Sequence, residues 1–355
     1  MLYRTLGRTG IQVSTLGLGT MVLGAWGNTD HASCARIVNR ALDAGINLVD
    51  TADVYAFGES EEIVGSAIRG RRDEVVLATK FHNPMGDDRN QRGNSRRWIR
   101  TAVDASLRRL DTDRIDLYQV HRPDPDTGIT ETIDALTDLV REGKILAWGT
   151  STFPADEIVE TCWAADRRHV AGPHTEQPPY SILARGIERD VLPACARHAM
   201  GVLVWSPLAG GWLTGKYQDA APADSRAATN PDHFDGGNTD KRAAVDRLQG
   251  IAEAAGLTLI QLALTWATEH PAVTAALIGP RTEDQLDDLL AGADVQLSVD
   301  VLDAIDAAVA PGTDLNPADR GFTPAGLDAD ARRRFPRRSL SGNRPDPESP
   351  SGGSA

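Results

Sequence analysis

The chain has 355 residues, a hydrophobic fraction of 41%, a charged fraction of 25% and a formal net charge of −13 at pH 7. These values are those of a globular protein with a sizeable core, and the length suits one large domain or two small ones. The acidic excess argues against nonspecific nucleic-acid binding, because such binding needs Lys and Arg to neutralise phosphates. No run approaches the roughly 20 apolar residues that span a bilayer, and the start lacks an apolar signal core, so we expect a cytoplasmic protein without a membrane partner.

The three cysteines, Cys34, Cys162 and Cys195, stand far apart in the sequence. This odd and sparse set fits reduced thiols better than a disulfide framework or a zinc site. We therefore expect no metal site and no redox role for these residues.

Strand-like and helix-like stretches alternate along the chain after a predicted hairpin at residues 4–14. The predicted strands are residues 15–19, 46–49, 75–79, 115–120, 145–149, 202–205 and 273–278. The predicted helices are residues 31–44, 59–69, 95–110, 130–142, 155–168, 187–198 and 258–269. Such alternation indicates parallel strands with crossover helices, in a closed barrel or an open doubly wound sheet. The first strand lacks the Gly-x-Gly-x-x-Gly turn of the open dinucleotide-binding sheet, which favours the barrel.

Two segments fall outside this alternation. Residues 216–241 are rich in Ala, Asp, Pro, Asn and Gly and are too long for an ordinary crossover, which makes them a candidate lid or cofactor-clasping loop. We assign residues 1–315 to the barrel and residues 316–355 to a tail. The last part of the tail, rich in Ser, Gly, Pro and Asp, is expected to be disordered because it cannot form a packed core.

Polar residues stand at the ends of three successive predicted strands. Asp50 and Tyr55 follow the strand at residues 46–49, Lys80 follows the next strand, and His121 follows the one after that. A tyrosine with its ordinary pKa near 10 is a poor proton donor at neutral pH, so a catalytic Tyr55 needs a nearby cation such as Lys80. Each residue alone also fits a structural role, and it is the combination that indicates chemistry.

These four residues lie in the motifs DTADVY, LATK and LYQVH, which resemble the catalytic tetrad of the aldo-keto reductases. The likeness runs from Tyr3 to about Pro311 and points to the branch with bacterial reductases and potassium-channel beta subunits. It implies an α/β protein with a (β/α)8 TIM barrel, an N-terminal hairpin that closes the amino end, a strand near residues 172–176 and an extra C-terminal helix.

The resemblance also implies NADPH-dependent reduction of aldehydes or ketones to alcohols by hydride transfer. Tyr55 would donate the proton, and Lys80 would lower the pKa of Tyr55. Asp50 would hold the Lys80 ammonium, and His121 would orient the carbonyl.

Cofactor contacts are implied in the same way. Ser151 and Gln177 match residues that bind the nicotinamide amide, Thr152 departs from the common Asn, and Trp205 matches an aromatic that stacks on the ring. The other expected cofactor contacts are Gly19, Thr20, Asp50, Ser206, Pro207, Leu208, Gly210, Lys216, Arg226, Gly279, Arg281 and Gln285.

The expected preference for NADPH over NADH depends on Arg281. It lies where the last predicted strand turns through Gly279 into a helix start, a geometry whose free N–H groups favour anions. Arg281 would bind the adenosine 2′-phosphate. Gln285 matches an adenine contact, but Leu289 replaces the family's asparagine.

Two other functions remain open at this stage. One is a regulatory or redox-sensing module that binds NADP(H), which the resemblance to the channel subunits implies. Those subunits have Asn at the position of His121. The other is a barrel enzyme such as a phosphosugar isomerase, against which the adenosine-binding features count. Trp26, Phe57 and His82 lie in loops that line the expected substrate pocket. The sequence does not identify the substrate or the oligomeric state, and we favour a monomer.

Overall fold

The computed structural model describes residues 1–217, 228, 235–293 and 295–323. Met1–Phe322 form one compact unit. Arg226, most of the predicted loop at residues 216–241 and most of the predicted tail lie outside the described residues, so the expectations for them stay predictions.

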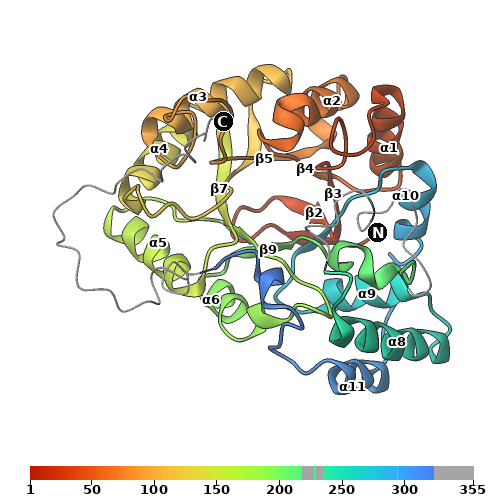
Figure 1. Ribbon diagram of the computed structural model, residues 1–355. Helices are drawn as coiled ribbons and strands as arrows, with labels where there is room; N and C mark the ends of the chain where they lie inside the picture. The colour runs from red at the N-terminus through yellow and green to blue at the C-terminus, as the bar shows by residue number, and fades with distance from the viewer. Residues whose placement is uncertain (218–227, 229–234, 294, 324–355) are drawn as a thin grey trace, which may run out of the picture. The chain divides into compact units, whose positions relative to one another are not determined.

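Eight parallel strands close into a barrel, in the order β10-β3-β4-β5-β6-β7-β8-β9 (Figure 1). The strands are β3 (Leu16–Gly19), β4 (Leu48–Asp50), β5 (Val76–Phe81), β6 (Ile115–Val120), β7 (Ile145–Ser151), β8 (Thr175–Gln177), β9 (Gly201–Val204) and β10 (Ala275–Ile278). The prediction of a closed barrel is therefore confirmed. The weak strand near residues 172–176, placed by resemblance, is β8.

An antiparallel hairpin of β1 (Tyr3–Thr5) and β2 (Gln12–Ser14) precedes the barrel, as predicted. Leu6 and Val13 are fully buried in a cluster with barrel residues such as Leu48 and Leu117. The turn at Gly7 has a φ of 54°, and a Cβ there would lie 2.3 Å from the carbonyl oxygen of His174. Only glycine fits this approach, which seats the hairpin against the end of the barrel opposite the strands' carboxyl ends.

Helices surround the barrel (Figure 1). They are α1 (His31–Asp43), α2 (Glu59–Ala67), α3 (Arg96–Arg109), α4 (Ile129–Arg141), α5 (Ala155–Arg167), α6 (Val191–Arg197), α8 (Thr239–Ala254), α9 (Leu259–Glu269), α10 (Glu283–Leu290) and α11 (Val299–Ala308). Short 3-10 turns are η1 (Tyr55–Gly58), η2 (Arg72–Glu74), η3 (Gly186–Glu188), η4 (Ala209–Thr214) and η6 (Pro317–Arg320). The expected extra C-terminal helix is α11.

The structure differs from the predicted helices in two places. The predicted helix at residues 187–198 is divided, because Asp190 adopts a non-helical conformation and caps α6 by accepting a hydrogen bond from the backbone N–H of Val191. Helix α8 was not predicted, and it begins with Asn238, whose side chain caps the helix at Lys241. The buried residues of α8 are Lys241, Ala244, Val245, Leu248 and Ala252, and only two of them are large apolar residues, which gives a weak apolar pattern in the sequence.

No single helix among the described residues is long and apolar enough to cross a membrane. Helices α8 and α9 reach the required length and composition only together, and they are bent by 92° at the break between them. A capping box of Thr258 and Gln261 starts α9 at this break.

A buried lysine joins α8 to the segment after α11. Lys241 is 2% exposed, and its Nζ lies 2.8 Å from Asp235 Oδ2 and 2.7 Å from Asp319 Oδ2. Asp235 also accepts hydrogen bonds from Trp212 Nε1 at 3.1 Å and Asn316 Nδ2 at 2.8 Å. These contacts fix η6 on the barrel and thereby place Gly321, the residue that follows it.

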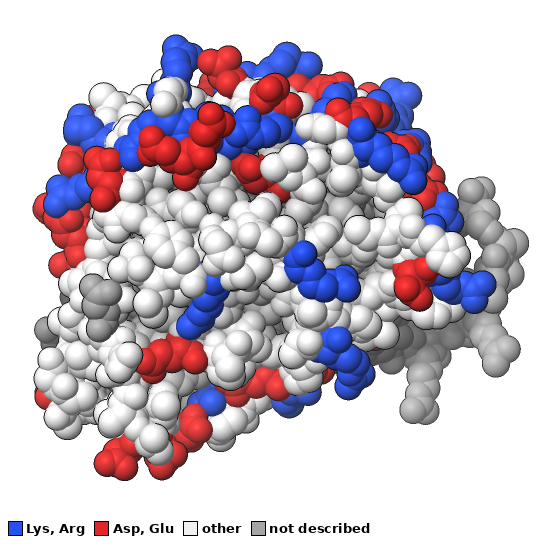
Figure 2. Space-filling view, turned by 180° about the vertical axis from the view of Figure 1, so that it is seen from behind, with Lys and Arg blue, Asp and Glu red and all other residues white. Residues whose placement is uncertain are grey.

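Exposed ion pairs connect neighbouring helices. Arg100 of α3 pairs with Glu142 after α4, and Arg36 of α1 pairs with Glu283 of α10. On the face that Figure 2 shows, Lys and Arg side chains lie among Asp and Glu along the upper edge, while the centre is largely uncharged. Such exposed pairs contribute little individually to stability.

Candidate active site

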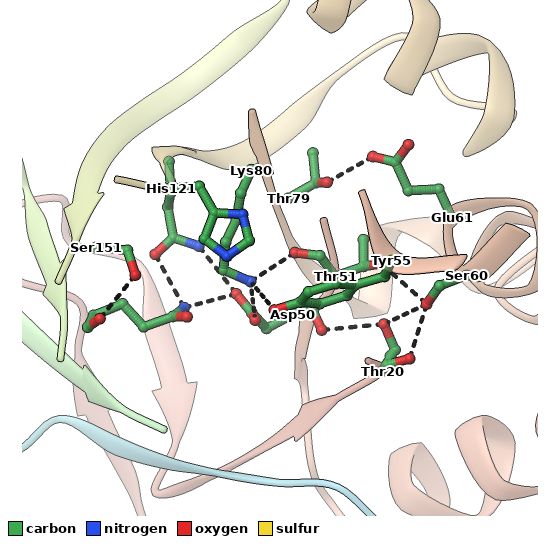
Figure 3. Close-up of polar contacts among 12 residues, drawn as sticks. Thr20, Asp50, Thr51, Tyr55, Ser60, Glu61, Thr79, Lys80, His121 and Ser151 are labelled. Carbon is green, nitrogen blue, oxygen red and sulfur yellow. Dashed lines mark hydrogen bonds and ion pairs between the residues drawn. The ribbon is translucent and has the colours of Figure 1, made fainter. Parts of the chain in front are cut away.

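The carboxyl ends of β4, β5 and β6 bring Asp50, Lys80 and His121 together (Figure 3). Asp50 is the last residue of β4, Lys80 lies within β5 opposite Gln119 of β6, and His121 directly follows β6. All of them are buried, and Lys80 has no exposed surface. Active sites of barrels of this type lie at this end, so the position fits a catalytic role.

The Lys80 ammonium is held by three acceptors. Its Nζ donates to Asp50 Oδ2 at 2.5 Å, to the carbonyl oxygen of Thr51 at 2.8 Å and to the Tyr55 hydroxyl at 3.2 Å. An ammonium has three donors, so every one of them is used. Tyr55 is therefore connected to Asp50 through a fully buried cation, as the sequence predicted.

Two glutamines complete the surroundings of Asp50. Gln119 Nε2 and Gln177 Nε2 donate to Asp50 Oδ1 at 3.0 Å and 2.8 Å. A buried carboxylate is tolerated only when its oxygens are hydrogen-bonded and its charge is paired, and Asp50 meets both conditions. Sequence analysis missed Gln119, although a polar residue inside the otherwise apolar run LYQV was a signal.

Burial raises the pKa of Tyr55, and the opposing effect of Lys80, which lowers it, is smaller. Lys80 thus lowers the pKa of Tyr55 as expected, and burial, which the sequence does not show, makes the net shift upward. Burial lowers the pKa of Lys80, but Asp50 and Tyr55 outweigh burial and the pKa is raised. At neutral pH Tyr55 keeps its proton and Lys80 keeps its charge.

His121 is a neutral imidazole at neutral pH. Burial, followed by the charges of Lys80 and Arg122, lowers its pKa well below the usual range. Asn83 Nδ2 lies 3.2 Å from Nδ1 of His121. With the Asn83 amide as donor, Nδ1 accepts and the ring proton sits on Nε2. The His121 ring lies edge-on to the Tyr55 ring, with the two centroids 5.9 Å apart.

Two predicted contacts of the nicotinamide amide lie next to this centre. Ser151 ends β7 and pairs in register with Gln177 of β8. The Ser151 hydroxyl donates to the Gln177 carbonyl oxygen at 2.9 Å, and the Gln177 side chain reaches Asp50. Both residues are nearly fully buried.

Trp205 follows β9 and is half-buried. A Cβ on Gly321 would lie 2.9 Å from Cζ2 of Trp205 and 3.2 Å from Cγ2 of Thr152, so the segment after η6 packs directly against both. Ser206 and Gly210 have φ values of 55° and 67°. The predicted pyrophosphate segment, which includes Pro207 and Leu208, is thus an irregular turn that leads into η4.

The predicted adenosine end is an ordered turn. Arg281 N–H donates to Gln285 Oε1 at 2.8 Å, and Asn28 Nδ2 donates to the Arg281 carbonyl oxygen at 2.8 Å. Gly279 lies against Gly19, since a Cβ on Gly279 would be 3.8 Å from the Gly19 carbonyl oxygen. Gln285 therefore holds the turn together, and its role as an adenine contact stays a prediction.

Two other predicted cofactor residues are placed by local contacts. Thr20 is fully buried, and its hydroxyl donates to the Asp50 carbonyl oxygen at 3.2 Å. Lys216 lies at the edge of the described residues, with Nζ 5.2 Å from the Tyr217 ring centroid.

The predicted pocket residues divide into two groups. Trp26 and Phe57 are 47% and 68% exposed, and the Trp26 ring centroid lies 6.2 Å from that of Tyr55 and 6.1 Å from that of Phe57. These two residues form an apolar surface beside Tyr55. His82 is instead held by Asn94, with Nδ1 2.9 Å from Asn94 Oδ1.

Residues 15–310 match the family model of the aldo/keto reductase family. The chain belongs to the aldo/keto reductase family. It is 39% identical over 324 residues to a probable voltage-gated potassium channel subunit beta of Arabidopsis thaliana, covering 87% of this chain and 97% of the relative. It is 38% identical over 335 residues to the uncharacterized oxidoreductase YrpG of Bacillus subtilis, covering 91% and 98%. The aldo-keto reductase YhdN of Bacillus subtilis is 39% identical over 296 residues, covering 81% and 88%.

Membership of this reductase family supports oxidoreductase chemistry on carbonyls and leaves several polar residues unaccounted for. Behind the tetrad, Glu61 accepts hydrogen bonds from Thr79 Oγ1 and Arg109 Nε, each at 2.6 Å. Both oxygens of the neighbouring Asp53 are buried without a hydrogen-bond partner among the described residues. Burial, reinforced by Glu61, raises the pKa of Asp53 well above its usual range. No local sequence pattern predicts this cluster, because its members come from separate elements.

Glu176 is a further buried acid that sequence analysis did not single out. It precedes Gln177, accepts from Thr150 Oγ1 at 2.5 Å and from Phe153 N–H at 3.1 Å, and has no exposed surface. Burial raises its pKa from 4.5 to about 7, while both hydrogen bonds act in the opposite direction. Glu176 therefore titrates near neutral pH within this family member's barrel.

We predict that Glu176 makes stability fall as pH rises. Between about 4.5 and about 7 the folded state keeps a proton that the unfolded state has lost, so the free energy of unfolding decreases across this window, by about 3 kcal/mol in total. Glu176→Gln keeps an acceptor oxygen for Phe153 N–H and turns an amide NH2 donor toward the Thr150 hydroxyl, which can accept, and it should remove this contribution. Urea unfolding of both proteins from pH 4.5 to 8 measures the difference. Equal pH slopes for the two proteins would show that Glu176 does not titrate in this range.

Proposed function

We propose that the protein reduces aldehydes or ketones to alcohols by hydride transfer from NADPH, with Tyr55 as the proton donor. The observation that carries the proposal is the buried Lys80 ammonium, which contacts both Asp50 and the Tyr55 hydroxyl. The cytoplasm is the expected compartment, and a small carbonyl compound is the expected partner.

The reaction requires charge stabilisation at one oxygen. When bound, NADPH supplies the hydride, and negative charge develops on the carbonyl oxygen of the substrate. Tyr55 and the Nε2–H of His121 are positioned to donate hydrogen bonds to that oxygen, and Tyr55 gives up its proton to it. Lys80 then stabilises the tyrosinate, while Asp50 balances the charge of Lys80.

The proposed cofactor contacts follow the other half of the barrel. Ser151 and Gln177 are next to the tetrad and offer side-chain groups for the nicotinamide amide. Trp205 offers an aromatic face, and the backbone turn after it has the conformational freedom that close approach to phosphate needs. Arg281, at the turn into α10, is the proposed ligand of the 2′-phosphate.

The alternative is a regulatory or redox-sensing module that binds NADP(H) with little turnover. The relative from Arabidopsis thaliana whose name describes a channel beta subunit supports this reading. The neutral His121 beside Tyr55 favours turnover, because a second donor to the carbonyl oxygen serves catalysis and is not needed for cofactor binding alone.

Tyr55→Phe should lower the rate of aldehyde reduction by at least about 10²-fold, because it removes the general acid. NADPH affinity should change little, since the hydroxyl contacts Lys80 and is not a proposed cofactor ligand. Steady-state kinetics with a panel of aldehydes, together with a fluorescence titration with NADPH, measure the two effects. A variant with wild-type turnover would refute the role of Tyr55.

Tyr118→Phe is the matched control for this substitution. Tyr118 is a fully buried tyrosine of β6, and its hydroxyl has no hydrogen-bond partner among the described residues. Removing it should leave turnover within about twofold of the wild type. If both phenylalanine variants lost activity equally, the loss would reflect packing in the barrel.

Arg281→Gln tests the cofactor preference. A hydrogen bond to a charged partner contributes about 1.5–3 kcal/mol, so the variant should bind NADPH roughly 10- to 150-fold more weakly. NADH lacks the 2′-phosphate, and its affinity should hardly change. Paired titrations at fixed ionic strength measure the affinities, since phosphate binding depends on salt. Equal weakening of both cofactors would mean that Arg281 supports the turn and does not select NADPH.

A further inference from the structure

Arg122 is a cation at the active site that the proposed chemistry does not use. It directly follows His121 at the end of β6 and is half-buried. Its Nη1 donates to the His121 carbonyl oxygen at 2.9 Å and to Thr152 Oγ1 at 2.6 Å. Among the described residues, Arg122 forms no ion pair, and its Nε and Nη2 have no acceptor.

The guanidinium lies within electrostatic range of the reacting groups. Its charge contributes to lowering the pKa of Tyr55 and of His121. Burial lowers the pKa of Arg122 itself, and Tyr55 and Glu176 only partly offset this effect. The hydrogen bonds of Glu176 go to Thr150 and Phe153, so this carboxyl group does not pair with Arg122.

Arg122 is held in place by a residue in an uncommon conformation. Thr152 has a φ of 59°, which is a rare conformation for a β-branched side chain. Its hydroxyl accepts the Arg122 hydrogen bond, and its methyl group lies against Gly321, which also packs on Trp205. The hydroxyl of Thr152, a residue that itself packs against Gly321, thus holds the Arg122 guanidinium at the site.

The two unused nitrogens are the important feature. Nε and Nη2 lie on one edge of the guanidinium, and this edge matches the two oxygens of a carboxylate or phosphate. The two contacts made by Nη1 use its two N–H donors, which the NH2 group of a neutral amide would also supply. A cation that is partly removed from water and has no counter-charge among the described residues is stabilised when an anion binds to it.

We propose that Arg122 binds an anionic group of the substrate, so that the preferred substrates are carbonyl compounds that also carry a carboxylate or a phosphate. This inference rests on the proposed function. The carbonyl oxygen lies between Tyr55 and His121, the carbon skeleton contacts Trp26 and Phe57, and the anionic group reaches the free edge of Arg122.

The test compares aldehydes that differ only in charge. 4-Formylbenzoate and its methyl ester form one pair, and glyceraldehyde 3-phosphate and glyceraldehyde form a second pair that distinguishes phosphate from carboxylate. The wild type should have a kcat/KM at least about 10-fold higher for one charged member than for its neutral counterpart. Arg122→Gln should remove this preference, mainly through a raised KM for the charged aldehyde. Arg122→Lys keeps the positive charge but lacks the paired N–H donors of the guanidinium, so it should retain part of the preference for the charged aldehyde.

Ionic strength provides a readout that a structural role would not change. The KM of the wild type for the charged aldehyde should rise with added NaCl, while the KM of Arg122→Gln should not. Thr152→Val is the second variant, because it removes the hydroxyl that holds Nη1 and should weaken the preference without removing the cation. It remains informative if Arg122→Gln does not fold.

Three results would overturn the inference. The first is that Arg122→Gln loses kcat/KM equally for charged and neutral aldehydes. The second is that the wild type prefers neither charged aldehyde. The third is that Arg122→Gln keeps the preference of the wild type for a charged aldehyde. A wild type that binds NADPH but reduces neither member of a pair would instead contradict the proposed function, and the inference with it. Reduction of neutral aldehydes without a charge preference would contradict the inference alone.

Discussion

The buried ion pair of Lys80 and Asp50 is the interaction on which the site depends. Two charges removed from water are stable only with close contact and complete hydrogen bonding. The protein supplies both, through the 2.5 Å contact, the Thr51 carbonyl oxygen and the amides of Gln119 and Gln177. These groups come from β4, β5, β6 and β8 and from the loop after β4, so the pair has all of its partners only when these strands are assembled in the barrel. Assembly of the barrel therefore stabilises the Lys80 ammonium beside Tyr55, and the fold and the proposed chemistry share one requirement.

Uncommon backbone conformations surround this pair. Ala56, Phe57, Thr152 and Ser206 all have positive φ values although none is glycine, and they lie in the loops that follow β4, β7 and β9. Such conformations are unfavourable alone and persist where the surrounding structure fixes them. Here these conformations orient the Tyr55 side chain toward Lys80 and the Thr152 side chain toward Arg122. They also determine the path of the turn after Trp205. The barrel is the rigid part of the molecule, and the loops at its carboxyl end use that rigidity to position side chains.

The sequence predicted what local patterns determine. Apolar runs that end in Asp50, Lys80 and His121 indicated the strands, and the resemblance to the aldo-keto reductases implied the tetrad. The alternation of elements left a closed barrel or an open sheet, and the missing Gly-x-Gly-x-x-Gly turn favoured the barrel. What depends on contacts between distant residues was not predicted. Gln119 and Glu176 become important only through partners on neighbouring strands, and the net pKa shift of Tyr55 is set by burial, which the sequence does not show. Helix α8 was missed because its apolar pattern is weak. The roles of the residues proposed to bind the cofactor remain predictions.

The central claim is that this buried centre transfers hydride to a carbonyl carbon. The most direct measurement supplies NADPH with deuterium at both C4 positions and an aldehyde in a single-turnover reaction, and analyses the alcohol by mass spectrometry. The account predicts one deuterium on the carbinol carbon, and a slower reaction than with unlabelled NADPH when hydride transfer limits the rate. An alcohol without deuterium, or NADPH that binds tightly and yields no alcohol with any aldehyde tested, would contradict it.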